Sequence, residues 1–417
     1  MKIWILGHYA VSPDSPGITR HYDIAAELIK HGHQVSIFSS SFDHTTRRDD
    51  KLRGKQNYQK QNINGVEFIW IKTSPYYRGN DWRRVVNMLS YTLRVIPLGV
   101  RYNERPDVVL ASSPHPFAGL AGYILAKTKR AQFVFEVCDL WPETFVEIGG
   151  YSNRSTIVKL LRVLEKFLYK RATKIVTVMP NASDYITKRG IPKEKIVYIP
   201  NGVDPDFFHN TISKMPEDLS EIISGLKSKK KVLVGYTGNH GVADSLSTLI
   251  EAAKFFQDKG LANIHFLLVG DGPDKKTLLE KAKGYSLNNV TFYNPIPKRA
   301  IPALLGAIDI AILTKRKSDL YKYGISFCKL FDYSICEKPI VWAVDSINNP
   351  VAEANCGITV PPESPVELSK AILELCELTE KERQDMGRRG YEYVMKYHSM
   401  PILAGRLLAA FGETSRG

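Results

Sequence analysis

Short runs of β-branched and apolar residues alternate with longer stretches whose apolar positions recur every three or four residues. In the first half of the chain the short runs are 2–6, 34–38, 107–112, 133–137, 174–178 and 195–199. The stretches around 20–30, 117–127 and 155–171 have the helical period. Continuous apolar strands separated by helices are typical of a parallel sheet covered on both faces, so we predict an α/β domain here.

The alternation stops at Pro200-Asn201-Gly202 and starts again after a polar stretch that ends near Lys231, in which we expect little helix. Further strands are predicted at 231–236, 265–270, 290–293, 310–314 and 339–343, with helices near 244–257, 274–283 and 326–336 and two more at the C-terminal end. The repetition predicts two Rossmann-like, doubly wound α/β domains in tandem. Ligands in such folds bind outside the carboxyl ends of the strands, so we expect two such edges to face each other across a cleft.

Composition narrows the class of partner. With 417 residues, 44% hydrophobic and 24% charged, the chain is globular rather than disordered, collagenous or coiled-coil. Its net charge of +14 favours an anionic partner, such as a nucleotide, a phosphate-bearing lipid, a membrane surface or nucleic acid. Five cysteines without a CxxC pair argue against a disulfide scaffold or a structural zinc site. The longest uncharged stretch, 108–126, is interrupted by two prolines and does not predict a membrane span.

Three glycine loops follow predicted strands, at 7–17, 238–241 and 270–272. Glycine lets a backbone approach a phosphate, and the amides at the start of the next helix can bind it. Turns between a strand and a helix also need glycine for steric reasons, so each loop alone is weak evidence. None of them spells a dinucleotide fingerprint or a P-loop, but together they favour a phosphate-bearing ligand.

The segment 326–333, SFCKLFDY, contains the most informative lysine. If a helix starts near Ser326, Lys329 lies in its first turn, where the helix dipole favours an anion and normally disfavours a cation. A bound diphosphate would explain the lysine. Asp332, three residues later on the same face, would then be placed to accept hydrogen bonds from ribose hydroxyls. Alternatively, both residues are solvated and the helix packs through Leu330 and Phe331.

With these motifs the chain resembles the bacterial family 4 glycosyltransferases of the GT-B fold, especially O-antigen and capsule enzymes that handle N-acetylated amino sugars and deoxysugars. The matching segments are CDLWPETFVEIG (138–149), IPNGVD (199–204), YTGNHGVADSLSTLIEAA (236–253), LLVGDGPDKKTL (267–278) and KLFDYSICEKPIV (329–341). The resemblance implies an acceptor-side domain at 1–204 and a nucleotide-sugar donor domain at 205–398. A C-terminal helix at about 399–417 is expected to pack back onto the first domain.

The resemblance also implies roles for individual residues. The loop around Gly17 would close over the donor, the 238–241 loop would approach the sugar diphosphate, and the backbone at Ile296 would contact the base. Lys329 would neutralise the diphosphate and Asp332 would hold the ribose. The complete expected donor set is Gly17, Gly238, Asn239, His240, Gly241, Gly272, Ile296, Lys315, Lys329, Leu330 and Asp332.

On the acceptor side we expect Asp139, together with Glu143, to orient or deprotonate the acceptor hydroxyl, with Lys329 as the third catalytic residue. His115 follows a predicted strand and is expected to contact the acceptor, unless it is a structural histidine between two prolines. No cofactor or metal is expected. The sequence Asp204-Pro205-Asp206 spells DxD but is interpreted as a turn.

The chain departs from the family pattern at two places. The family's pair of glutamates, separated by seven residues, would fall at positions 324 and 332, where this chain has Gly324 and Asp332. The segment similar to DLWPE is preceded by Cys138, where many relatives have histidine. Both departures bear on which sugar is transferred and how the acceptor is held.

The resulting hypothesis is a retaining transferase of hexosyl or N-acetylhexosaminyl type, with a UDP-sugar as donor and a lipid-linked or saccharide acceptor. A UDP-sugar 2-epimerase of the same architecture is an alternative that would need no acceptor. A two-lobed sugar-binding protein is a more remote one. Nucleic-acid binding would explain the charge, but no recognised nucleic-acid motif is present.

Two stretches of the first half predict a peripheral membrane surface. On the expected helix 155–171 a basic stripe recurs at spacings of three and four, and an apolar face lies beside it: Lys159, Arg162, Lys166 and Lys170, against Ile157, Leu160, Leu161, Leu164 and Leu168. The stretch 82–101 is also amphipathic, with Trp82, Val86, Leu89, Leu93 and Ile96 on one side. We expect these helices to hold the acceptor domain at the anionic cytoplasmic face of the membrane. Two ordinary packed helices are the alternative.

Overall fold

The computed structural model describes residues 1–412 except for 16, 53, 78–81, 148–150 and 211–213. Residues 148–149 of one motif and 413–417 of the expected C-terminal helix therefore lie outside the described residues. The chain divides into two compact units. Unit 1 comprises residues 1–201, 322–326 and the chain from Met400 onward, and unit 2 comprises residues 202–321 and 327–399.

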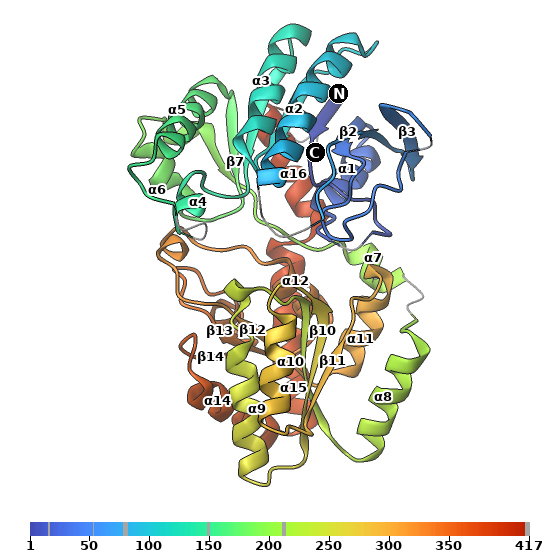
Figure 1. The fold of residues 1–417 in the computed structure, drawn as a ribbon, viewed down its shortest axis with the longest axis vertical. Coiled ribbons are helices and arrows are strands. Elements are labelled where there is room, and N and C mark those ends of the chain that lie inside the picture. The colour runs from blue at the N-terminus through green and yellow to red at the C-terminus, as the bar shows by residue number, and fades with distance from the viewer. Residues whose placement is uncertain (16, 53, 78–81, 148–150, 211–213, 413–417) are drawn as a thin grey trace. The chain divides into compact units, whose positions relative to one another are not determined.

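Unit 1 is built on an eight-stranded sheet (Figure 1). Its strands are β1 Lys2–Leu6, β2 Gln34–Ser40, β3 Tyr58–Ile63, β4 Val66–Ile71, β5 Val108–Ser112, β6 Gln132–Val137, β7 Lys174–Thr177 and β8 Ile196–Tyr198. They lie in the order β3-β4-β2-β1-β5-β6-β7-β8, and every neighbouring pair is parallel except β3 and β4. The doubly wound parallel sheet predicted for this half is confirmed.

Helices cover both faces of this sheet. They are α1 Arg20–Lys30, α2 Trp82–Arg101, α3 Pro116–Lys129, α4 Glu143–Glu147, α5 Thr156–Arg171, α6 Ala182–Thr187 and α16 Met400–Phe411. Alternate residues of β1 point to opposite faces: Trp4 packs in one core with α2, α3, α5 and α6, and Ile5 packs in the other with α1 and α16. The last helix of the chain thus contributes to the core of the first unit.

Unit 2 contains a six-stranded parallel sheet in the order β11-β10-β9-β12-β13-β14. Its strands are β9 Val232–Asn239, β10 Ile264–Asp271, β11 Val290–Tyr293, β12 Ile310–Thr314, β13 Ile340–Ala343 and β14 Gly357–Thr359. Its α-helices are α7 Pro205–Asn210, α8 Glu217–Ser228, α9 Ser247–Asp258, α10 Lys275–Gly284, α11 Ile301–Ala307, α12 Cys328–Ile335, α13 Pro350–Glu353, α14 Pro365–Glu377 and α15 Glu380–Tyr397. Helices α9, α10 and α14 share one core with the sheet. The second predicted parallel sheet is also confirmed.

Several elements differ from the sequence-based prediction; strand β14 and the short helices α6 and α11, for example, were not predicted. The stretch 201–230, expected to contain little helix, forms α7 and α8, because Leu219 and Ile223 are four residues apart and give α8 one buried side. The antiparallel hairpin of β3 and β4 was not predicted at all. Its turn contains Asn64 and Gly65, both with positive φ (50° and 89°). Among the described residues, no helix is both long and apolar enough to cross a membrane.

Candidate active site

In unit 2 the conspicuous polar residues gather at the carboxyl ends of adjacent strands. The glycine loop 238–241 begins with the last two residues of β9, the loop 270–272 begins with the last two residues of its neighbour β10, and Lys315 follows β12 on the other side. Ligands of doubly wound sheets bind at this edge. The predicted donor residues from these three loops are therefore brought to one place.

The two glycine loops touch through their backbones. Gly270 has φ of +152°, and a Cβ atom there would lie 1.8 Å from the carbonyl oxygen of Gly238. A Cβ on Gly272 would lie 2.5 Å from the carbonyl oxygen of His240. Gly238 itself has φ of +124°, a conformation that side chains rarely adopt. Glycine is required at these positions whether or not a ligand binds.

A cluster of two lysines and one carboxylate lies beside the first loop. Asp244 accepts hydrogen bonds on Oδ1 from the ammonium groups of Lys315, at 2.8 Å, and Lys329, at 3.1 Å. Its other oxygen accepts from the Asn239 amide at 3.1 Å, and Lys329 also donates to the hydroxyl of Tyr236. We call Tyr236, Asp244, Lys315 and Lys329 the lysine cluster. It holds one more positive than negative charge.

The surroundings perturb both kinds of charge in the cluster. Burial lowers the pKa of Lys329 to about 8, and Lys315 adds to this, while Asp244 opposes it. Burial alone would raise the pKa of Asp244, but Lys329 and Lys315 hold it at about 2. At neutral pH the carboxylate is therefore ionised and the lysine mostly protonated. Perturbed groups gathered at a strand edge are typical of functional sites.

Helix α12 adds its own dipole. It starts at Cys328, so Lys329 lies in its first turn as predicted, and its N-cap residue, Phe327, provides no side-chain hydrogen bond. Amides at such a helix start attract anions. Leu330 faces the core, and Asp332 is half-buried on the same helix.

His240 and Ile296 were predicted near the donor. The His240 ring is fully buried, and within the described part of the chain neither ring nitrogen has a hydrogen-bond partner. Burial and Lys275 lower its pKa to about 4, so the ring is neutral. Ile296 is buried in the loop after β11. Gly241 is close-packed, since a Cβ there would lie 2.3 Å from the Asn239 side-chain nitrogen.

The predicted acceptor-side residues belong to unit 1, where the structure gives them different surroundings. Asp139 is exposed just after β6. Gly17, which was predicted on the donor side, also belongs to unit 1 and is exposed with φ of +131°. Glu143, the first residue of α4, accepts hydrogen bonds from Arg162 and Arg189, each at 3.2 Å. Glu143 therefore belongs to an ion-pair network that joins α4, α5 and the segment after α6.

His115 does not reach the surface. It is the N-cap of α3, its Nδ1 accepts a hydrogen bond from the Ala118 amide at 3.3 Å, and its Nε2 lies 2.6 Å from Nδ1 of His8. The His8 ring is stacked between Tyr9 and Tyr91, with centroids 4.3 and 4.5 Å away. In this structure His115 is hydrogen-bonded to His8. A direct contact of His115 with an acceptor stays a prediction.

The sequence-based prediction missed Asp244 and Tyr236. Asp244 is 71 residues from Lys315 and 85 from Lys329 along the chain, so no local spacing connects them. The available signal was an acidic residue shortly after a glycine loop that was expected to bind an anion. Tyr236 lies inside a strand pattern and carried no signal of its own.

Comparison with known proteins identifies the fold and the family of relatives. A family model described as Glycosyltransferase Family 4 matches residues 17–207, and one described as Glycosyl transferases group 1 matches residues 220–393. The chain is 22% identical over 324 residues to the putative colanic acid biosynthesis glycosyl transferase WcaI of Escherichia coli K12, covering 76% of this chain and 77% of that protein.

Solved structures match over almost the whole length. Sucrose-phosphate synthase from Thermosynechococcus elongatus superimposes with a TM-score of 0.72 and 16% identity, covering 99% of this chain and 98% of that one. HepE from Anabaena, in complex with UDP-glucose, gives a TM-score of 0.68 with 16% identity and 99% coverage of both chains. At this identity the likeness establishes the fold, which is the predicted GT-B architecture.

Proposed function

Since the chain belongs to the family 4 glycosyltransferases, we propose that it transfers a sugar from a UDP-sugar to an acceptor hydroxyl with retention of the anomeric configuration. The observation that carries the donor assignment is the lysine cluster at the carboxyl edge of the second sheet, beside a helix start and two close-packed glycine loops. HepE, which has the same fold, binds UDP-glucose.

The cluster suits a leaving diphosphate. Breaking the bond between sugar and phosphate moves negative charge onto the diphosphate, and fixed positive groups stabilise that charge most in the transition state. Lys329 and Lys315 supply two ammonium groups, and Asp244 holds both in place through one oxygen. Asp332, on the same helix as Lys329, is proposed to bind the ribose. Asp139 is proposed to orient the acceptor hydroxyl.

The acceptor is proposed to be a lipid-linked or saccharide molecule of cell-surface polysaccharide synthesis. This rests on relatives such as WcaI, whose name assigns it to colanic acid biosynthesis. The transferred group is proposed to be a hexosyl or N-acetylhexosaminyl residue.

We expect UDP-sugars to raise the melting temperature of the protein, because a ligand that binds only the native state stabilises it by about 2.7 kcal/mol at a hundred times its Kd. The measurement is a thermal-shift panel of UDP-, GDP- and ADP-sugars, with free UDP included. Incubation of the best donor without acceptor, followed by product analysis, separates transfer from 2-epimerisation. If no nucleotide sugar shifts the transition, the donor assignment is wrong.

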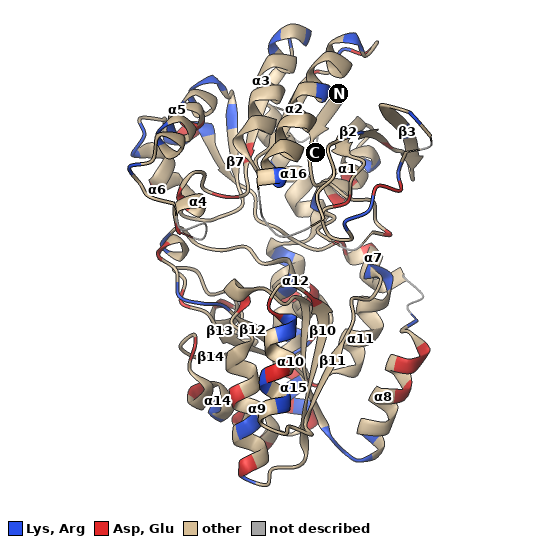
Figure 2. Ribbon diagram, in the orientation of Figure 1, with Lys and Arg blue, Asp and Glu red and all other residues tan. Residues whose placement is uncertain are grey.

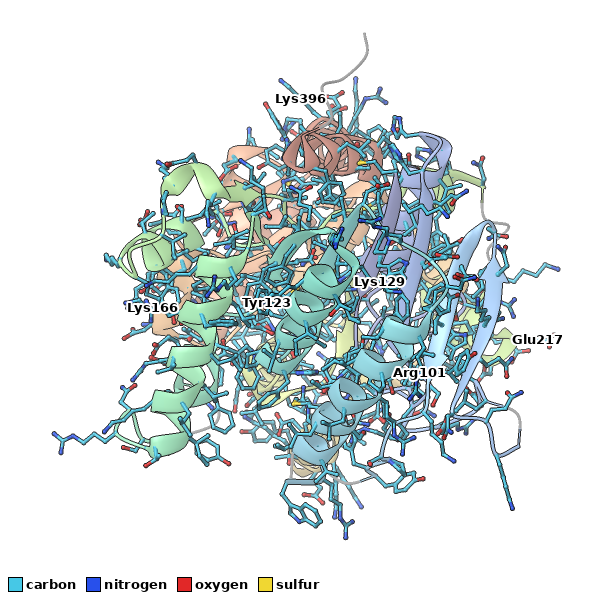
Figure 3. All side chains as sticks on the ribbon, turned by 90° about the horizontal axis from the view of Figure 1, so that it is seen from above. Arg101, Tyr123, Lys129, Lys166, Glu217 and Lys396 are labelled. Atoms are coloured by element: carbon cyan, nitrogen blue, oxygen red, sulfur yellow. The ribbon has the colours of Figure 1, made fainter. Side chains whose placement is uncertain are left out.

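We further propose that unit 1 binds anionic membranes through helices α2, α3 and α5, which lie side by side in one layer with α3 in the middle (Figure 3). Their outer side exposes large apolar residues, which are Trp82, Val85, Val86, Leu89, Leu93 and Val100 on α2 and Ile157, Leu160 and Val163 on α5. We call this side the α2–α5 surface. Trp82 and Leu93 are about 70% exposed (69% and 71%), which is unusual for such residues on packed helices.

The charges on the three helices point to an anionic lipid surface. Together they contain eleven lysines and arginines and one acidic residue, Glu165, which is buried. Figure 2 shows basic positions on each of the three helices. The residues on this surface differ in two respects from the sequence-based expectation. Arg162 donates to Glu143 and Asn153, and Leu161 and Leu168 point into the core while Ile157 and Leu160 face outward. Exposed apolar side chains next to Lys159, Lys166 and Lys170 fit an interfacial helix.

Replacement of Lys159, Lys166 and Lys170 by Gln should weaken binding to vesicles that contain phosphatidylglycerol by about a hundredfold, at about 1 kcal/mol for each lysine. Sedimentation with mixed phosphatidylglycerol and phosphatidylcholine vesicles at low and high salt measures this. The matched control replaces three exposed lysines of unit 2, Lys276, Lys283 and Lys381. Equal pelleting with neutral and anionic vesicles would contradict the proposal, as would equal losses in both triple variants.

A further inference from the structure

A cluster of arginine, histidine and tyrosine side chains in unit 1 has no role in the proposed donor chemistry. It lies near the carboxyl ends of three neighbouring strands: Tyr9 follows β1, His44 and Arg47 follow β2, and Tyr76 follows β4. Arg84, in the first turn of α2, completes it. We call these five residues the arginine cluster. Its place in the fold is the ligand-binding edge of the first sheet.

The five side chains form one connected network. Arg84 Nε donates to the Tyr9 hydroxyl at 3.3 Å, and the Tyr9 ring stacks on His44 with centroids 4.8 Å apart. His44 Nδ1 is hydrogen-bonded to the Tyr76 hydroxyl, and the Arg47 guanidinium carbon lies 4.7 Å from the centre of the Tyr76 ring. The network joins two guanidinium groups through three aromatic rings, two of which carry hydroxyls.

One part of the network lacks a hydrogen-bond partner. Nη1 of Arg47 is buried, and within the described residues it has no acceptor. A buried donor on a charged group is costly to leave unpaired, because it has lost its water without gaining a partner. Arg47 also has φ of +58°, which is uncommon for a residue other than glycine. An anion placed against this nitrogen would supply the missing acceptor.

Two carboxylates of the described residues bear on the charge of the cluster. Asp43, which precedes Arg47 by four residues, accepts on Oδ1 from the backbone amides of Thr45 and Thr46 and so serves the turn. Asp139 interacts electrostatically with Arg84. Burial lowers the pKa of His44 to about 4, and the positive charges of Arg84 and Arg47 add to this effect. At neutral pH His44 is therefore a neutral ring among cations.

We propose that the arginine cluster binds the phosphate of the acceptor, and that the acceptor is a saccharide linked to an isoprenoid diphosphate, whose sugar hydroxyl receives the transferred residue. Two arginines offer planar forks of donors that match phosphate oxygens, and the tyrosine hydroxyls add further donors. Helix α2 starts in this cluster and exposes apolar side chains of the α2–α5 surface along its length. A lipid whose diphosphate is bound by the cluster could therefore lay its hydrocarbon chain along these side chains. This inference rests on the proposed function, because it names the acceptor class for that reaction.

The test measures binding of geranylgeranyl diphosphate to the full chain by calorimetry, with UDP present in excess to occupy the donor site. The R47Q and R84Q variants should each bind about tenfold to a hundredfold more weakly, as expected for loss of a charge-assisted contact. Arg105, exposed before β5 and outside helices α2, α3 and α5, provides the matched control: R105Q should bind as the unchanged protein does. Melting temperatures and UDP binding of every variant report on folding and on the donor site.

Three outcomes overturn the inference. Equal affinity for geranylgeraniol and its diphosphate would mean that the phosphate is not recognised. Unchanged affinity in both R47Q and R84Q would place the phosphate elsewhere. If glucose 1-phosphate binds and the isoprenoid diphosphate does not, the ligand of the cluster is a soluble phosphate ester and not a lipid. If UDP itself fails to bind, the proposed function fails, and the same titration without UDP still tests the arginine cluster.

Discussion

Replacing Lys329 by Ala should lower kcat/KM for sugar transfer by about a hundredfold to a thousandfold, which corresponds to about 2–4 kcal/mol of transition-state stabilisation. The reason is the place of its ammonium group, in the first turn of α12 and 3.1 Å from Asp244. Asp244 keeps its bond to Lys315 in this variant, so we expect the fold to persist. Initial rates with a UDP-sugar, together with a melting curve, measure both effects.

The pH dependence gives a second readout of the same residue. Since the pKa of Lys329 is about 8, kcat/KM should fall as the pH rises through that value, because the free enzyme loses the charge that meets the diphosphate. The fall in kcat should come at higher pH, since a bound anion favours the protonated lysine. Lys317→Ala, an exposed lysine two residues after Lys315, is the matched control. A folded Lys329→Ala protein with near-native turnover would remove the lysine from the mechanism.

Gly270→Ala should destabilise unit 2 by more than about 3 kcal/mol and lower its melting temperature by about 6–12 °C. A Cβ at this position would overlap the Gly238 carbonyl oxygen, at 1.8 Å, and no side-chain rotation can relieve a clash between two backbones. Because the loops at 238–241 and 270–272 would have to separate, UDP binding should be lost as well. Calorimetry and UDP titration on the purified variant measure the two effects.

Gly284→Ala is the control for this substitution. Gly284 ends α10, and a Cβ there would meet nothing within 4 Å. Its melting temperature should stay the same or rise slightly, since alanine restricts the unfolded chain. Equal melting temperatures for Gly270→Ala and the unchanged protein would show that the two loops are not held in contact.

The strands and most helices could be predicted because each buried strand is a continuous apolar run and each covering helix has one apolar side. The β3–β4 hairpin was missed because β3 reads YQKQNI, without an apolar alternation, and lies at the exposed edge of its sheet. The pair Asn64-Gly65 was the signal that could have found it. Helix α8 was missed because only Leu219 and Ile223 of its twelve residues are buried.

The candidate site shows the same limit. Lys329 was recognisable, since a cation in the first turn of a helix conflicts with the helix dipole and needs a reason. Asp244 was not, because its relation to the two lysines exists only after β9 and β12 have paired and brought distant segments together. Glu143 is the opposite case: it was predicted as catalytic from its motif. Its contacts, Arg162 on α5 and Arg189 in the segment after α6, lie outside that motif.

The pair formed by His8 and His115 has a fixed direction. Since the Ala118 amide donates to Nδ1 of His115, the ring hydrogen of a neutral His115 is on Nε2 and is donated to Nδ1 of His8, 2.6 Å away. His8 must then carry its own hydrogen on Nε2, so both tautomers are set by the first turn of α3. A second proton on either ring would oppose a hydrogen already present, and burial lowers the pKa of His115 to about 3. The two imidazoles therefore form an aligned pair of dipoles that stays uncharged at physiological pH.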